Sequence, residues 1–214
     1  MTFTVEDAQF VKSATKAGEW PPPAAPEIAF AGRSNVGKSS LLNALAQRHR
    51  LARVSRTPGR TRLLNFFDLS VVERSGGKKL APRAIRFCDL PGYGYAKGNR
   101  DEIRTWGPMI EAYLRERPPL RAVVLLVDGE LGPQESDREM LAWLSTAASR
   151  KVLVAATKMD RLGVTRRKVQ LDKVARELGV SPEAALCLSS KEKFGVDELW
   201  RALLSLGDAP PAST

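Results

Sequence analysis

The sequence predicts an α/β fold in which a mixed six-stranded sheet carries helices on both faces. The first observation is alternation, because short runs of β-branched and aromatic residues are separated by longer segments with helical periodicity. The second is that two of these runs are joined by a segment too short for a helix, which indicates a hairpin and one antiparallel strand. The third is size: 214 residues, 43% of them hydrophobic, can bury a substantial core.

Six strands and five helices are expected along the chain. The strand runs are 27–31, 63–72, 84–90, 122–128, 152–156 and 184–188. The helices are 38–47, 101–117, 134–147, 165–178 and 196–205. Three consecutive prolines fit neither a helix nor a central strand, so residues 1–26 are expected to form an extended arm that packs on the domain. A single domain over 27–206 and a flexible tail over 207–214 complete the prediction.

Composition and charge restrict the class of protein. The longest apolar run, 122–127, is too short to span a bilayer, and acidic residues stand where a signal peptide needs basic ones. We therefore expect a cytoplasmic monomer that does not enter a membrane. The chain has 34 Lys and Arg against 24 Asp and Glu, a net charge of +10. This excess favours a polyanionic partner such as nucleic acid, with a basic surface for solubility as the alternative.

A phosphate-binding loop is indicated directly after the first strand of the predicted domain. Residues 32–39 match G-x-x-x-x-G-K-[ST] and stand between a strand and a helix, the context that the motif requires. In such a loop backbone N–H groups surround a phosphate, so Lys38 is expected to reach the β- and γ-phosphates and Ser39 to place its hydroxyl on Mg²⁺. The expected nucleotide-binding residues here are Gly32, Arg33, Ser34, Asn35, Val36, Gly37, Lys38, Ser39 and Ser40.

A second motif, D-x-x-G, stands at the end of a later strand. Asp89 can hold Mg²⁺ through water, and the backbone N–H of Gly92 can contact the γ-phosphate. An ordinary turn is the alternative for so short a motif. Its position downstream of a phosphate loop and at a strand end favours the nucleotide-binding interpretation.

The segment 157–160, T-K-M-D, determines the base. A carboxylate accepts two hydrogen bonds from N1–H and the exocyclic amine of guanine, and adenine offers neither donor at these positions. Asp160 is therefore expected to select GTP over ATP, while the stem of Lys158 can lie against the base and Thr157 can link this loop to the phosphate loop. An S-S-K segment after the last strand offers N–H groups to guanine O6, with an ordinary loop as the alternative. Its residues are Ser189, Ser190 and Lys191.

These motifs in this order resemble the translation-factor-related GTPases, and their spelling resembles the bacterial EngB family, also called YihA or YsxC. The resemblance rests on GRSNVGKSSLLN from Gly32, SRTPGRTRLLNFF from Ser55, DLPGYGYAK from Asp89 and TKMD from Thr157. It covers the chain from about Phe10 to Leu204. The resemblance implies a cytosolic GTPase that uses GTP, GDP and Mg²⁺. It also implies a role in assembly of the large ribosomal subunit or its precursor, and in normal cell division.

The resemblance also assigns the first switch to residues 58–61. Gly59 is expected to contact the nucleotide. Thr61 is preferred to Thr57 as a Mg²⁺ ligand, because the family's P-G-x-T pattern ends on it. The expected catalytic residues are Lys38, Thr61 and Gly92.

Two residue choices bear on the rate of hydrolysis. Tyr93 follows Gly92 where signalling GTPases place the glutamine that orients the attacking water, so slow intrinsic hydrolysis is expected. Related GTPases with Asn at the position of Asn35 can use K⁺ beside the phosphates, which would neutralise developing charge. The alternative, that Asn35 only tightens the loop, stays open.

An arginine-rich segment covers the end of the first helix and the first switch. Residues 48–62 contain six arginines and no acid, which suits contact with a phosphate backbone. A solvated loop is the alternative. Two other functions also remain open: an RNA-binding scaffold in which the nucleotide is structural, and a tRNA-modification or membrane-associated GTPase.

Overall fold

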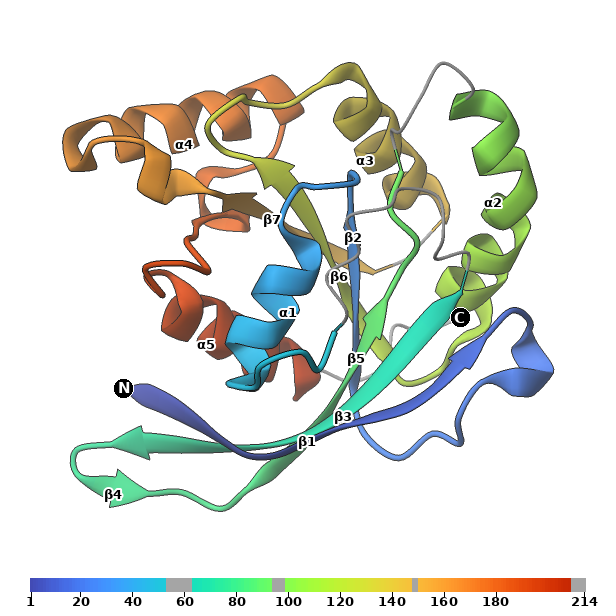
Figure 1. The fold of residues 1–214 in the computed structure, drawn as a ribbon, viewed down its shortest axis with the longest axis horizontal. Coiled ribbons are helices and arrows are strands. Elements are labelled where there is room, and N and C mark those ends of the chain that lie inside the picture. Colours follow the sequence, from blue (N-terminus) through green and yellow to red (C-terminus); the bar gives the residue numbers. More distant parts are fainter. Residues whose placement is uncertain (53–62, 94–98, 148–149, 209–214) are drawn as a thin grey trace.

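The computed structural model describes residues 1–52, 63–93, 99–147 and 150–208 (Figure 1). The described strands form one sheet in the order β1-β3-β5-β2-β6-β7-β8, with β4 paired to β3. Neighbours from β5 to β8 pair in parallel, and β3 is antiparallel to β1, β4 and β5. The strands are β1 (Thr2–Ala14), β2 (Glu27–Gly32), β3 (Leu64–Ser75), β4 (Lys78–Lys79), β5 (Arg83–Asp89), β6 (Leu120–Asp128), β7 (Lys151–Thr157) and β8 (Ala185–Cys187).

The predicted mixed α/β sheet is confirmed. The predicted count of six strands is wrong, because the described residues alone form eight. The first additional strand is β1, which lies in the predicted arm and pairs with β3 over nearly its whole length. Its register shifts between Val5 and Asp7 and again between Phe10 and Lys12, and such bulges interrupt the alternation by which a sequence indicates a strand. The second, β4, has only two residues, too few for a sequence pattern.

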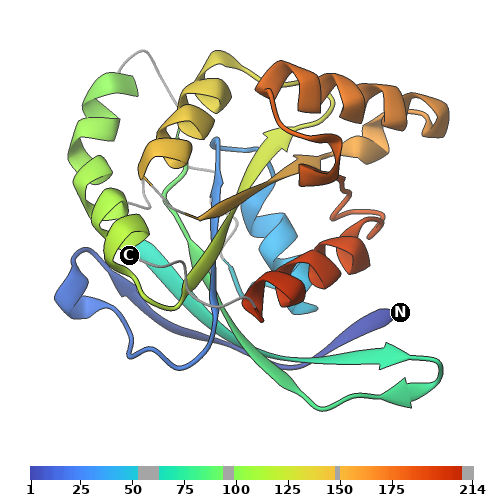
Figure 2. The ribbon, with the colours of Figure 1, turned by 180° about the vertical axis from the view of Figure 1, so that it is seen from behind.

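Helices cover both faces of the sheet (Figures 1 and 2). They are α1 (Lys38–Ala46), α2 (Asn99–Glu116), α3 (Glu135–Ala147), α4 (Val164–Leu178) and α5 (Val196–Gly207). α1 and α5 bury their apolar side chains in one core cluster, and α2, α3 and α4 bury theirs in a second. In the described part of the chain, no helix is both long enough and apolar enough to cross a bilayer.

The core consists of two clusters because the spacing of apolar residues along each strand and helix determines which face of the sheet they join. Along β2, Ile28 and Phe30 join the α1–α5 cluster and the intervening Ala29 joins the other, because successive strand side chains point to opposite faces. Along α5, buried residues recur at spacings of three and four, which places them on one side of the helix. These residues are Val196, Leu199, Trp200, Leu203 and Leu204.

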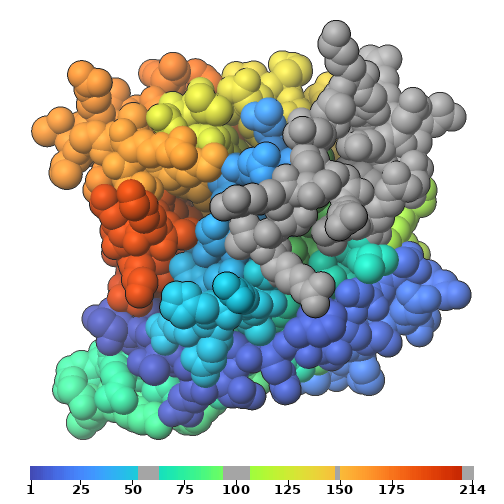
Figure 3. All heavy atoms as spheres, viewed as in Figure 1, coloured from blue at the N-terminus to red at the C-terminus, as the bar shows by residue number. Residues whose placement is uncertain are grey.

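The hairpin of β3 and β4 projects beyond the helices at the lower left of the molecule (Figure 3). Lys78 and Lys79 of β4 are exposed there, and Lys79 forms an ion pair with Glu6 of β1. The strands β1 and β3 therefore extend past the helix-covered part of the sheet, on the side of the molecule away from α3 and α4.

Candidate nucleotide-binding site

The predicted motifs lie at one edge of the sheet. β2, β5, β7 and β8 belong to the parallel part, so their carboxyl ends face the same way. The phosphate loop follows β2, Asp89 ends β5, Thr157 ends β7 and the S-S-K segment follows β8. The chain leaves β2 for α1 on one face and the neighbouring β6 for α3 on the other. In α/β sheets, ligands bind beyond the carboxyl ends of the strands at the point where neighbouring connections leave for opposite faces.

The phosphate loop has a backbone conformation that few residue types adopt. Asn35 has φ of 65° and Gly37 has φ of 105°, in the left-handed region that Gly and Asn tolerate best. A Cβ on Gly32 would lie 2.8 Å from Cγ1 of Val36, so the close approach of these two residues requires glycine. The loop leads into α1, whose first N–H groups and dipole favour an anion.

Lys38 and Asp89 contact each other beside this loop. Lys38 Nζ donates hydrogen bonds to Oδ1 of Asp89 and, at 2.8 Å, to the carbonyl oxygen of Leu90. Their side chains are only 12% and 10% exposed. A nearly buried ammonium and carboxylate at the start of α1 fit a phosphate and its Mg²⁺, the first as a counter-charge and the second as an oxygen donor. Ser39 is half-buried on the same helix, and Ser40 is exposed.

Backbone contacts join the D-x-x-G segment to the phosphate loop. The N–H of Ser34 donates to the carbonyl oxygen of Tyr93 at 2.9 Å, and the N–H of Tyr93 donates to that of Gly32 at 3.3 Å. Arg33 and Tyr93 form an isolated parallel bridge. Gly92 lies against the loop, since a Cβ built on it would be 3.2 Å from Oγ of Ser34. The structure thus places the D-x-x-G segment beside the phosphate loop.

The side chain of Tyr93 packs toward α3. It is 2% exposed, and its hydroxyl donates a hydrogen bond to Oδ1 of Asp137 at 2.9 Å. The other oxygen of Asp137 accepts the N–H of Gln134 at 2.9 Å and so satisfies a free donor beside the N-terminus of α3. Burial raises the pKa of both Tyr93 and Asp137. From the sequence, Tyr93 was noted only because it stands where signalling GTPases have a glutamine, and its packing against α3 was not predicted. No motif indicated Asp137.

The T-K-M-D loop is hydrogen-bonded to the phosphate loop and to β6. Oγ1 of Thr157 donates to the carbonyl oxygen of Val36 at 2.7 Å, which is the link expected from the sequence. Nζ of Lys158 donates to Oδ2 of Asp128, at the end of β6, at 2.7 Å. Asp128 therefore fixes the end of the Lys158 side chain. Sequence reasoning missed Asp128, because an aspartate at the end of a buried strand has no distinguishing spacing.

Asp160 and Ser189 come together from segments 29 residues apart. Oγ of Ser189 donates to Oδ1 of Asp160 at 2.7 Å, and Ser189 is fully buried. Each carboxylate oxygen can accept more than one hydrogen bond, so Asp160 keeps the capacity to accept two from guanine. Sequence reasoning gave Ser189 a backbone role only, whereas its hydroxyl orients the carboxylate. Ser190 is half-buried and Lys191 is exposed.

The first switch lies outside the described residues, and with it Gly59 and Thr61. The arginine-rich segment is described only over 48–52. There, Arg48 donates a hydrogen bond at 2.9 Å to the carbonyl oxygen of Glu6 on β1. This arginine contacts its own chain, while the proposed RNA contact of the other members stays a prediction.

The fold and the arrangement of motifs define a P-loop GTPase. A family described as 50S ribosome-binding GTPase matches residues 27–158. "Probable GTP-binding protein EngB" of Anaeromyxobacter sp. (strain K) is 54% identical over 99% of this chain and 96% of that protein. The protein of the same name from Myxococcus xanthus (strain DK1622) is 48% identical over 94% of each. The chain belongs to the EngB family of GTP-binding proteins.

Solved structures agree on the fold. The crystal structure of a probable GTP-binding protein engB has a TM-score of 0.61 and 21% identity, covering 84% of this chain and 97% of that one. Aquifex aeolicus Era bound to GDP and aluminium fluoride has a TM-score of 0.64 and 21% identity, covering 88% of this chain and 59% of that one. These likenesses confirm the P-loop GTPase fold.

Proposed function

We propose that this GTPase acts in assembly of the large ribosomal subunit, and that its nucleotide state controls binding to the subunit or its precursor. The observation that carries the proposal is the match of residues 27–158 to a family described as 50S ribosome-binding GTPase. The net charge of +10 supports an RNA-rich partner. A cytoplasmic location and a contribution to normal cell division belong to the same proposal and rest on membership of the EngB family.

The bound nucleotide is proposed to be GTP or GDP with Mg²⁺. Ser39 and Thr61 would hold the metal directly and Asp89 through water, and the metal would neutralise charge on the phosphates. The contact between Lys38 and Asp89 supports this assignment. Asn35 is proposed to contact K⁺. Its left-handed backbone accounts for Asn at this position without an ion, so the dependence of turnover on K⁺ separates the two explanations.

Slow intrinsic hydrolysis is the third part of the proposal. The side chain that follows Gly92 is buried and hydrogen-bonded to Asp137, which supports the view that Tyr93 does not orient the attacking water. A transition-state contact supplied by a partner can accelerate such reactions by 10³-fold or more. Turnover should therefore be slow for the purified protein and rise when ribosomal particles are added. Fast, K⁺-independent turnover by the protein alone would contradict this.

Sedimentation of ribosomal particles with the tagged protein tests the partner. We expect co-sedimentation with the large subunit or its precursor in GTP or a non-hydrolysable analogue, and less in GDP. Binding should weaken steeply with salt. Replacing Arg53 and Arg56 with Ala should flatten the salt slope by about one unit per lost phosphate contact. A matched control replaces Arg166 and Arg176, exposed on α4, and should leave the slope unchanged.

The second candidate is an RNA-binding scaffold in which the nucleotide is structural. The same experiment distinguishes it, because a scaffold should sediment equally with GDP and GTP and should show turnover that particles do not change. A wild-type salt slope in the Arg53 and Arg56 double variant would instead place the RNA contact elsewhere. The exposed lysines of β4 are the next residues to replace.

A further inference from the structure

Arg167, in the first turns of α4, lies between the two loops that meet at Asp160. Its Nε donates hydrogen bonds to the carbonyl oxygens of Met159 and Leu162, each at 3.1 Å. These carbonyls stand on either side of Asp160 in the chain. One nitrogen of Arg167 therefore holds both ends of the short turn that carries the base-selecting carboxylate.

The Arg167 guanidinium also contacts the loop that follows β8. Its central carbon lies 4.2 Å from the centroid of the Phe194 ring, a cation–π contact. A terminal nitrogen of Arg167 approaches Oε2 of Glu192 at 3.5 Å. The residue thus bridges two segments that are otherwise joined here by the Ser189–Asp160 hydrogen bond and by backbone contact between Met159 and Leu188.

The contacts of Arg167 converge on Ser189. The carbonyl oxygen of Phe194, whose ring stacks on Arg167, accepts the N–H of Ser189 at 3.1 Å. The N–H of Glu192 donates to Oγ of Ser189 at 2.9 Å, and this hydroxyl donates to Asp160. Holding Phe194 and Glu192 therefore holds the hydroxyl that orients the Asp160 carboxylate.

A planar, permanently charged group is suited to this position. The guanidinium presents N–H donors at its edge and a flat face to an aromatic ring, whereas a lysine offers a point charge without that face. The Arg167 side chain is 21% exposed, so its contacts are partly shielded from water. Its neighbour Arg166 is exposed on the same helix and gives an equal change of charge for comparison.

We propose that Arg167 is a positioning residue for guanine recognition: it holds the Asp160 turn and the loop of Ser189 in the relative placement that lets Asp160 accept two hydrogen bonds from the base. The inference rests on the proposed role of Asp160 in selecting guanine. Without Arg167 the two loops keep their chain connections and lose the bridge, so discrimination at the base edge decreases while phosphate binding by Lys38 persists.

Competition binding of GDP and inosine diphosphate tests the proposal, because inosine lacks the 2-amino group that forms one of the two hydrogen bonds to a carboxylate. The affinity ratio of GDP to inosine diphosphate is measured for the full chain, well below the unfolding temperature. We expect Arg167→Ala to lower this ratio by about fivefold, equivalent to ~1 kcal/mol. Phe194→Leu, which keeps the apolar volume and removes the aromatic face, should lower it in the same direction. Arg166→Ala should leave it unchanged.

Asp160→Asn is included so that the two proposals can fail separately. If Asp160→Asn lowers the ratio and neither Arg167→Ala nor Phe194→Leu does, the inference on Arg167 is wrong and the role of Asp160 stands. If Asp160→Asn leaves the ratio unchanged, both are wrong. Equal weakening of the two ligands by Arg167→Ala, with an unchanged ratio and a lower melting temperature, would show that Arg167 only stabilises the fold and would overturn the proposal.

Discussion

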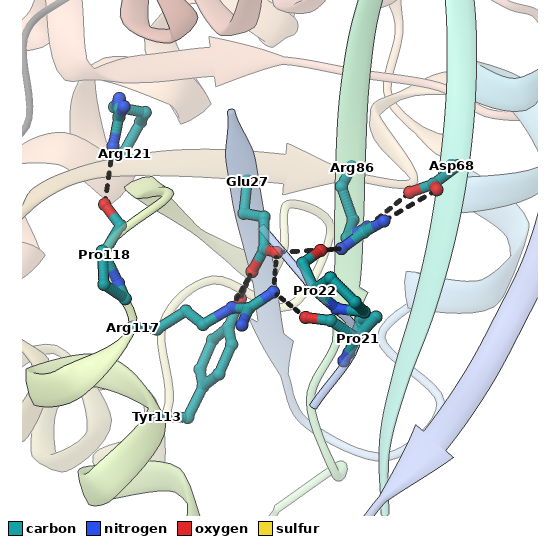
Figure 4. A network of polar contacts seen from close by, with 9 residues as sticks. All are labelled: Pro21, Pro22, Glu27, Asp68, Arg86, Tyr113, Arg117, Pro118 and Arg121. Atoms are coloured by element: carbon teal, nitrogen blue, oxygen red, sulfur yellow. Dashed lines mark hydrogen bonds and ion pairs between the residues drawn. The ribbon is translucent and has the colours of Figure 1, made fainter. Parts of the chain in front are cut away.

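Replacing Arg117 with Met is expected to lower the free energy of unfolding by about 3 kcal/mol, because it removes the main counter-charge of a buried carboxylate. Glu27 begins β2 and is fully buried, and Arg117, just after α2, is 3% exposed. Two nitrogens of Arg117 donate to the Glu27 carboxylate, one of them at 2.9 Å (Figure 4). One of these nitrogens also donates to the carbonyl oxygen of Pro21 at 2.8 Å. The variant therefore removes hydrogen-bond donors from both the Glu27 carboxylate and the Pro21 carbonyl.

The magnitude follows from what remains around Glu27. Breaking a buried ion pair by removing one partner costs about 3–5 kcal/mol. Two partners stay in place: Tyr113, whose hydroxyl donates to Glu27 at 3.1 Å, and Arg86, whose Nη1 lies 3.5 Å from its other oxygen. Arg86 also pairs with Asp68, so its charge is shared. We therefore expect the lower end of the range. A chain of this size should lose about 6–12 °C of melting temperature.

Urea unfolding of the nucleotide-free protein measures the change. Arg121→Met is the matched control, because Arg121 lies in the same region and, among the residues that the structure describes, donates to the nearby carbonyl oxygen of Pro118, at 2.8 Å, and to no carboxylate (Figure 4). It should change stability by less than about 0.5 kcal/mol. Adding Glu27→Gln to Arg117→Met should recover part of the loss by removing the unpaired charge. Equal stability of the Arg117 and Arg121 variants, or a double variant less stable than Arg117→Met, would refute this account.

Three further predictions concern the site. Asp160→Asn exchanges a carboxylate acceptor for an amide, so GTP should bind several kcal/mol more weakly and the nucleotide preference should move toward xanthosine nucleotides. Competition binding measures this change, and equal binding of ATP and GTP by the wild-type protein would contradict the role of Asp160. Lys38→Ala should abolish tight nucleotide binding, whereas Ser39→Ala should weaken mainly the Mg²⁺-dependent part, and titration of labelled GDP with and without Mg²⁺ separates them. Burial raises the pKa of Asp137 above its ordinary value of 3.8, so the folded state binds this proton more tightly than the unfolded state does. The resulting contribution to the free energy of unfolding is complete below about pH 3.8 and is lost as the pH rises through the raised pKa. Asp137→Asn should flatten that pH dependence of urea unfolding, and an unchanged slope would assign it to other groups.

Much of the fold was predictable because the apolar residues of most strands and helices recur with the spacing typical of that element. The buried run of β6 and the apolar stripe of α5 are visible in the sequence without knowledge of their partners. β1 was not predictable, because its pairing with β3 depends on residues about 50 to 70 positions away and its bulges disturb the alternation. A local sequence pattern does not identify a strand whose position is determined mainly by the strand with which it pairs.

The residues of the candidate site also fall into a group that the sequence indicated and a group that it did not. The phosphate loop and Asp160 belong to contiguous motifs, so residue type and spacing indicated them without knowledge of the fold. Asp128, Asp137 and Arg167 act on the site through side-chain contacts between separate elements, and nothing in their own sequence surroundings marks them. Such supporting residues become visible only once the fold has brought them together.

The position of β1 has a consequence for how the chain is made. The N–H of Phe3 donates at 3.3 Å to Asp197, which is 194 residues away, and the Phe3 ring lies 6.5 Å from that of Trp200 in α5. At 5–20 residues per second, about 10–40 s separate the synthesis of these two ends. Throughout that interval Phe3 lacks the α5 contacts that later cover it, and it is available to chaperones. Burial of Phe3 therefore waits for the synthesis of α5, and a variant that lacks α5 should expose Phe3 of β1.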